Sequence, residues 1–169
     1  GGAIAVRSEV GRGTTFRLHF PVAEGHVAAA PPAARLRSDW RGEGLVLLVD
    51  DELALRELGA QMIQRLGLDV VTAKNGREAV ALYRELRERI SCVVLDWIMP
   101  EMGGAETLRE LGAIAPGVRV IVASGHAPGD IESHLRNQEI VALLRKPFDL
   151  GELGRVLQVA TSGRADGRR

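Results

Sequence analysis

The sequence lacks three features that would each indicate a particular class of protein. It has one cysteine, Cys92, so it contains neither an intramolecular disulfide framework nor a cysteine-based metal cluster, which fits a reducing compartment. Its 22 Lys and Arg residues balance 22 Asp and Glu residues, and zero net charge gives no global field for nucleic acid or an anionic membrane. No apolar run approaches membrane-spanning length, and the N-terminus carries no signal-peptide pattern, so neither feature is expected.

What is present is the composition of a folded domain with appendages. Of 169 residues, 46% are hydrophobic and 26% charged, which is enough for a proper core. Residues 23–44 are rich in Ala, Pro, Gly and Arg without helix or strand periodicity, and we interpret them as a linker. The alternative is an irregular segment that packs on the domain through Trp40. The tail 161–169 is expected to be disordered, and the first residue, Gly1, suggests a fragment.

Residues 45–160 alternate short apolar runs with amphipathic segments. Most of the runs lack strict apolar-polar alternation, as parallel strands covered on both faces do; they are 45–49, 69–72, 92–95, 118–123 and 140–144. Apolar stripes at three- and four-residue spacing predict five helices between and after them; their first marker residues lie near 55, 75, 108, 130 and 149. Asn75 and Asp149 occupy N-cap positions. The pattern predicts an α/β fold with a doubly wound, five-stranded parallel sheet and helices on both faces.

Polar side chains follow four of the predicted strands. Asp50 and Asp51 follow the first strand, Asp96 ends the third, Ser124 follows the fourth and Lys146 follows the fifth. In a doubly wound sheet, ligands bind outside the carboxyl ends of the strands, where these side chains would meet. A purely structural strand end requires none of these residue types, so the rim is the predicted functional site.

The residue types at this rim suit phosphoryl transfer. Three crowded carboxylates repel one another, and a hard divalent cation such as Mg²⁺ would let all of them stay ionised. Lys146 can balance the charge of a bound phosphoryl group, Ser124 can donate a hydrogen bond to it, and a carboxylate is available as the nucleophile.

Four motifs in order resemble the receiver domain of two-component response regulators over residues 45–160. They are "VLLVDDE", "VVLDWIMPEMGG", "VIVASGH" and "LLRKPF", each at the end of a predicted strand. The resemblance implies a flavodoxin-like sheet with strand order 2-1-3-4-5. It also implies that Asp96 accepts a phosphoryl group from a phosphohistidine. Asp51, Asp96 and the backbone carbonyl of Ile98 would bind Mg²⁺ directly, and Asp50 would contribute through water.

The same resemblance implies roles for Lys146 and Ser124, and it shows one position at which this chain differs from many receivers. Lys146 would hold the phosphoryl oxygens, and Ser124 would be the switch hydroxyl that moves toward them. Three residues before that lysine many receivers carry Tyr or Phe, whereas this chain has Leu143, which leaves the aromatic half of the switch in doubt. His126 either influences how water reaches the phosphoryl group or is an exposed loop histidine.

Residues 1–22 resemble a different family. Ile4 and Val6, then Phe16 and Leu18, alternate with polar residues across a glycine-containing turn, which predicts a β-hairpin with one apolar face. The "GRGTTFRLHFPV" ending is similar to the last glycine box and closing strands of the ATP-binding domain of sensor histidine kinases. The remainder of such a domain does not precede it, so ATP binding by this fragment is not expected.

The order of kinase remnant, linker and receiver implies a C-terminal fragment of a bacterial hybrid sensor histidine kinase. The expected partners are a histidine kinase phosphodonor domain, in cis or in trans, and a histidine phosphotransferase, with no nucleic acid and no membrane contact by this fragment. The fragment would be cytoplasmic and would catalyse only its own phosphorylation and dephosphorylation. The alternative is a Mg²⁺-dependent aspartyl-phosphate phosphatase, but those enzymes carry the nucleophile on the first strand, with a second Asp two positions later.

Overall fold

The computed structural model describes residues 2–21, 40–125, 131 and 140–162, which fall into two units. The first unit is an antiparallel hairpin of β1 (Ala3–Glu9) and β2 (Gly13–His19), as predicted. Ile4 lies opposite Leu18, and Val6 opposite Phe16. These four side chains are between 57% and 65% exposed, so one face of the hairpin is apolar and uncovered within the described part of its unit. A hairpin of this kind is marginally stable alone.

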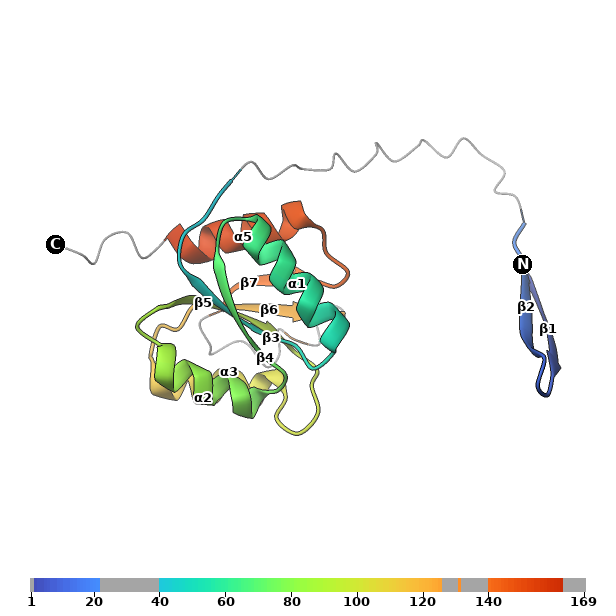
Figure 1. The fold of residues 1–169 in the computed structure, drawn as a ribbon, viewed down its shortest axis with the longest axis horizontal. Coiled ribbons are helices and arrows are strands. Elements are labelled where there is room, and N and C mark those ends of the chain that lie inside the picture. The colour runs from blue at the N-terminus through green and yellow to red at the C-terminus, as the bar shows by residue number, and fades with distance from the viewer. Residues whose placement is uncertain (1, 22–39, 126–130, 132–139, 163–169) are drawn as a thin grey trace. The chain divides into compact units, whose positions relative to one another are not determined.

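The second unit contains a five-stranded parallel sheet (Figure 1). Its strands are β3 (Leu45–Val49), β4 (Asp69–Ala73), β5 (Ile90–Asp96), β6 (Val120–Ser124) and β7 (Ile140–Arg145). They lie in the order β4-β3-β5-β6-β7, which within this unit is the predicted order 2-1-3-4-5. The switch in strand order therefore lies between β3, which is followed by Asp50 and Asp51, and β5, which ends in Asp96.

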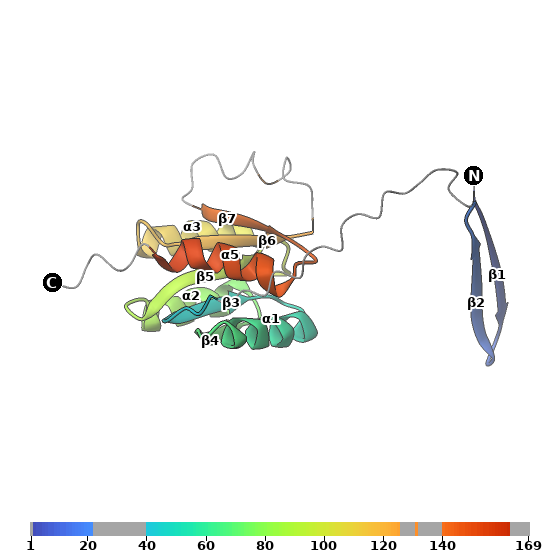
Figure 2. The same ribbon diagram turned by 90° about the horizontal axis from the view of Figure 1, so that it is seen from above.

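Helices cover both faces of the sheet (Figures 1 and 2). The helices α1 (Leu53–Arg65) and α5 (Leu150–Thr161) lie on one face, and α2 (Gly76–Leu86) and α3 (Gly104–Ile114) on the other. The predicted N-caps are present: the Asn75 side chain accepts a hydrogen bond from the backbone of Glu78, and Asp149 forms a capping box with Glu152. The helix predicted near residues 130–137 lies, apart from Ile131, outside the described residues.

Successive strand residues point into two separate apolar layers. One layer, against α2 and α3, takes the odd-numbered side chains of β3 and β5 and the even-numbered ones of β6: Leu47, Val49, Val93, Leu95, Val120 and Val122. The other, against α1 and α5, takes the alternate set: Val46, Leu48, Cys92, Val94, Ile121 and Ala123. Because both faces are buried, these strands show no apolar-polar alternation in the sequence, and the sheet is a rigid platform for its rim.

Two contacts fix the ends of this unit. Trp40 packs against the layer under α1 and α5, and the Gly42 N–H donates to the Leu66 carbonyl at 2.9 Å, so the last residues of the expected linker lie on the domain. At the other end, the Arg119 guanidinium donates to the carbonyls of Val159 and Ala160, at 2.8 and 2.6 Å. These carbonyls belong to the last turn of α5, which lacks intrahelical donors for them, so the residue just before β6 caps this helix.

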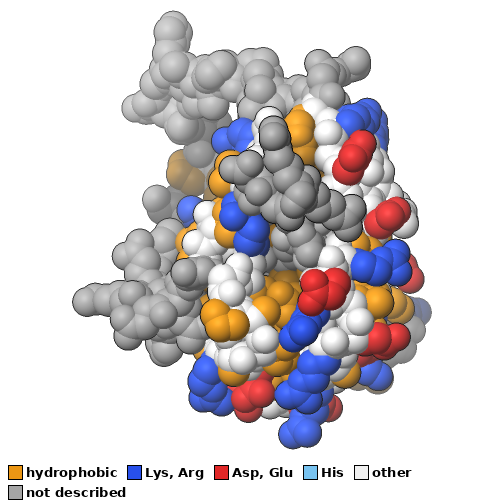
Figure 3. Space-filling view, turned by 90° about the vertical axis from the view of Figure 1, so that its left-hand side faces the viewer, with side chains coloured by type: hydrophobic (Ala, Val, Ile, Leu, Met, Phe, Trp, Pro, Cys, Tyr) orange, Lys and Arg blue, Asp and Glu red, His pale blue; other side chains and the backbone are white. Residues whose placement is uncertain are grey.

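The surface charges agree with the balanced composition. On the face shown in Figure 3, basic and acidic side chains are interspersed with apolar ones. Within the described ranges, no helix combines the length and apolarity needed to cross a bilayer.

Candidate functional site

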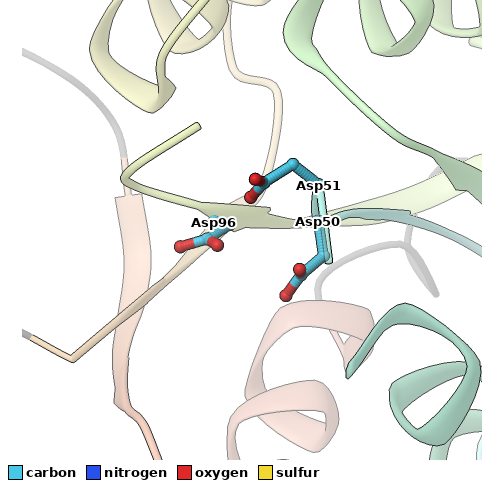
Figure 4. Close-up of side chains that lie close together, drawn as sticks. All are labelled: Asp50, Asp51 and Asp96. Atoms are coloured by element: carbon cyan, nitrogen blue, oxygen red, sulfur yellow. The ribbon is translucent and has the colours of Figure 1, made fainter. Parts of the chain in front are cut away.

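Three carboxylates meet at the ends of two neighbouring strands (Figure 4). Asp50 and Asp51 directly follow β3, and Asp96 is the last residue of β5; the preceding residues Val49 and Leu95 are partners in the parallel ladder. One carboxylate oxygen of each acid lies within 4.8 Å of those of the other two. Asp50 and Asp96 are buried, at 5% and 9% exposed, whereas Asp51 is open to solvent.

Lys146, the residue directly after β7, supplies positive charge to this cluster. Its Nζ donates to Asp50 Oδ2 at 2.7 Å and to Asp96 Oδ2 at 2.8 Å. Its backbone N–H donates to the Ser124 carbonyl at 2.8 Å, which continues the β6–β7 ladder and directs the lysine toward the acids. Three carboxylates against one ammonium leave a formal charge of −2, so the site is suited to attract a divalent cation.

The protonation of the two central groups follows from burial and from their mutual bonds. Burial raises the pKa of Asp96 above its ordinary value, and the charge of Asp50 adds to the rise, whereas the hydrogen bond from Lys146 opposes it. Burial alone would lower the pKa of Lys146, but its bonds to Asp50 and Asp96 outweigh that effect and the pKa is raised. Lys146 is therefore an ammonium at neutral pH.

The turn that carries the acid pair is closed by hydrogen bonds to Asp50. The backbone N–H of Glu52 donates to Asp50 Oδ1 at 2.9 Å, and the Asp50 N–H donates to the Ala73 carbonyl at 3.1 Å. The guanidinium of Arg56, in the first turn of α1, donates to the Asp50 backbone carbonyl. Sequence reasoning did not identify Arg56; the available signal was a basic residue in the first turn of a helix, directly after two acids.

The other predicted residues lie around the cluster at different depths. Ser124 is buried at the end of β6, beside Asp96, whose ladder partner is Ala123. The backbone N–H of Ile98 points at Asp96 Oδ1 at a long 3.4 Å, so the main chain of Ile98 lies beside the Asp96 carboxylate. Leu143 lies opposite Val122, half-buried on the α2 and α3 side. His126 lies outside the described residues.

An apolar groove of about 290 Å³ adjoins the cluster on the α1 side. Asp50 and Lys146 form its polar end; the apolar part includes Leu55, Leu58, Met62, Pro147 and Phe148. Leu55 and Leu58 are both exposed on α1. The rim therefore combines a charged centre with an apolar wall that solvent can reach.

Comparison with known proteins assigns this arrangement to a family. The model of the response regulator receiver domain matches residues 46–158. Sensor kinase CckA of Brucella abortus (strain 2308) is 38% identical over 160 residues, covering 90% of this chain and 17% of that protein. Against the sensor kinases that it matches, the chain spans about a fifth of their length or less.

Solved structures agree. The receiver domain from hybrid histidine kinase CckA is 28% identical, with a TM-score of 0.58 over 69% of this chain and 99% of that one. A chain of the CheX-CheY-BeF3-Mg+2 complex from Borrelia burgdorferi is 26% identical, with a TM-score of 0.65 over 68% of this chain and 87% of that one. Fold, acid cluster and family model coincide on the same residues. The chain therefore belongs to the response regulator receiver domain family.

Proposed function

We propose that this chain is the phosphoacceptor module of a two-component phosphorelay and that Asp96 carries the phosphoryl group. The observation that carries the proposal is the Lys146 ammonium, 2.8 Å from Asp96 in a cluster that still has a formal charge of −2. Such a site can neutralise a phosphoryl group with Lys146 and still attract a divalent cation. Phosphoryl transfer depends mainly on positioning and on this kind of charge neutralisation.

The donor set fits Mg²⁺. Mg²⁺ prefers one or two carboxylates, together with waters and a phosphate, to a complete protein cage. Asp51 is exposed and Asp96 reaches the same space, so these two carboxylates and the Ile98 carbonyl would hold the ion. Asp50 already accepts bonds from Glu52 and Lys146, and would contribute through water. When bound, Mg²⁺ would screen the negative charge that otherwise repels an incoming phosphoryl group.

In the proposed reaction, a carboxylate oxygen of Asp96 attacks the phosphorus of a phosphohistidine. The new O–P bond forms as the P–N bond breaks, and the imidazole nitrogen keeps the electron pair of that bond. Lys146 moves its hydrogen bond from the carboxylate to a phosphoryl oxygen. The hydroxyl of Ser124, beside Asp96 at the end of β6, then donates to a second phosphoryl oxygen. This movement of Ser124 would shift the backbone that follows β6.

The donor would be a helical phosphohistidine domain, of a histidine kinase or a histidine phosphotransferase. The apolar groove beside Lys146 gives it a docking surface, because Leu55 and Leu58 are exposed directly next to the charged centre. An apolar helix face there would bring its histidine to the rim. Charged substitution at Leu58 should then slow transfer from a phosphohistidine protein but not from a small acyl phosphate.

The parent protein is proposed to be a bacterial hybrid sensor histidine kinase, with this fragment on the cytoplasmic side. The alignment with CckA covers 90% of the chain, well beyond the receiver match at 46–158, so it includes residues toward the hairpin. We therefore assign 1–22 to the end of an ATP-binding domain, 23–44 to a linker, 45–160 to the receiver and 161–169 to a tail. In the parent, the remainder of the ATP-binding domain would cover the apolar face of the hairpin.

The arrangement does not favour an aspartyl-phosphate phosphatase. Such an enzyme has its nucleophile on the first strand, whereas here the acids after β3 are adjacent in sequence and the buried acceptor ends β5. The proposed function is tested by intact mass after incubation with acetyl phosphate and Mg²⁺. One phosphoryl adduct is expected on the wild type, and none with Asp96→Asn or with EDTA.

The control is Asp69→Asn, which removes an exposed acid at the start of β4 and should leave the adduct in place. An adduct that persists in Asp96→Asn, or a wild type that acquires none, would contradict the proposal.

A further inference from the structure

Arg56 is placed where a helix gains nothing from a cation. It lies in the first turn of α1, and that turn contains no acidic residue. Its side chain is half-buried. A positive charge near a helix N-terminus opposes the helix dipole and so destabilises the helix. Two sources of negative charge nearby can compensate for this placement: Glu52 at the N-cap of α1 and the acid cluster, with its formal charge of −2.

The guanidinium binds one particular atom, the backbone carbonyl oxygen of Asp50. That carbonyl belongs to the peptide unit joining Asp50 to Asp51, and a peptide unit is planar. Holding the oxygen of Asp50 therefore fixes the plane from which Asp51 departs. Asp51 is exposed, whereas the carboxylate of Asp50 is held by bonds from the Glu52 N–H and from Lys146 Nζ.

We infer that Arg56 is a positioning residue that orients Asp51 for the divalent cation. This inference rests on the proposed function for the identity of the cation, Mg²⁺. It opposes a simple electrostatic expectation, because removing a positive charge beside three carboxylates would by itself strengthen cation binding. If Arg56 orients Asp51, replacing it should weaken Mg²⁺ binding. If only its charge matters, replacing it should strengthen Mg²⁺ binding.

The test is a Mg²⁺ titration of the full chain. Binding is measured by calorimetry and by the fluorescence of Trp97, which adjoins Asp96 in sequence. Residues that orient metal ligands typically contribute at least tenfold to affinity, so we expect Arg56→Met to raise the Mg²⁺ dissociation constant about tenfold. Arg56→Lys, which keeps a donor and the charge, should recover part of the loss. Arg65→Met removes the same charge from the last turn of the same helix and should leave the constant within about twofold.

An unchanged or lower dissociation constant in Arg56→Met would overturn the inference. A second readout needs no metal: the amide of Glu52, bonded to Asp50 Oδ1, should exchange faster with solvent in Arg56→Met but not in Arg65→Met. If the wild type binds no Mg²⁺, the metal part of the proposed function fails. The inference is then tested only as a statement that Arg56 orders the acid turn. Equal exchange rates of the Glu52 amide in the two variants would refute it.

Discussion

Replacing Lys146 with Met tests how the charged centre is balanced, because it removes the ammonium and keeps the apolar stem. The side chains of Lys146, Asp50 and Asp96 are only 19%, 7% and 12% exposed, so both ion pairs are largely shielded from water. Removing one partner of a buried pair typically costs about 3–5 kcal/mol. We expect a loss of about 3 kcal/mol in unfolding free energy at neutral pH without divalent cations, the lower end of that range.

The same substitution should make stability depend on Mg²⁺. The formal charge of the cluster changes from −2 to −3, so the variant should bind the ion at least about tenfold more tightly, equivalent to about 1.4 kcal/mol. Binding to the folded state alone adds to stability, so Mg²⁺ should recover more of the unfolding free energy in the variant than in the wild type. Urea unfolding in EDTA and in excess Mg²⁺ measures both quantities.

Lys74→Met is the matched control, because Lys74 is exposed and its loss removes the same charge. It should change the unfolding free energy by no more than about 0.5 kcal/mol in either buffer. The reasoning is refuted if Lys146→Met costs no more than this control, or if Mg²⁺ restores no more stability to it than to the wild type.

Two further predictions concern the body of the domain. Burial raises the pKa of Cys92 to about 12, so its thiol should stay unreactive toward Ellman's reagent at pH 8 in the native state and react on unfolding; rapid native labelling would contradict this. A Cβ on Gly76 would lie 2.0 Å from Thr107 Oγ1 and 2.8 Å from the Met102 carbonyl, so Gly76→Ala should lower the unfolding free energy by about 1–3 kcal/mol. Gly112→Ala, which meets nothing within 4 Å in α3, should instead raise it by about 0.5–1 kcal/mol, and equal effects of the two substitutions in urea unfolding would contradict the packing.

The sheet could be predicted because its signals are local. Apolar runs buried on both faces, bounded by glycine, proline and capping residues, predicted the order of the five sheet strands, the four helices that the structure describes, and the position of each of these strands within about two residues. Asn75 and Asp149 were recognised as caps for the same reason, since their bonds reach only three residues along the chain. Parallel topology then placed the acids, Ser124 and Lys146 at one rim.

Long-range contacts of side chains could not be predicted from the sequence. The bridge from Lys146 to both Asp50 and Asp96 depends on the register of β7 against β6, which no short motif specifies. The bond from Arg56 depends on the direction in which α1 leaves the acid turn. The sequence allows Trp40 to belong to a free linker or to pack on the domain. Only the position of the turn at Leu66 decides whether its ring can pack against the core.

The capping of α5 by Arg119 has a practical consequence for expressing this domain. The family match runs from 46 to 158, but the carbonyls that Arg119 holds belong to Val159 and Ala160, and Trp40 covers the core six residues before the match begins. A gene fragment trimmed to the match would leave a guanidinium without acceptors and uncover apolar surface at the opposite end. A fragment of residues 40–162 keeps both contacts and is longer at both ends than the family match.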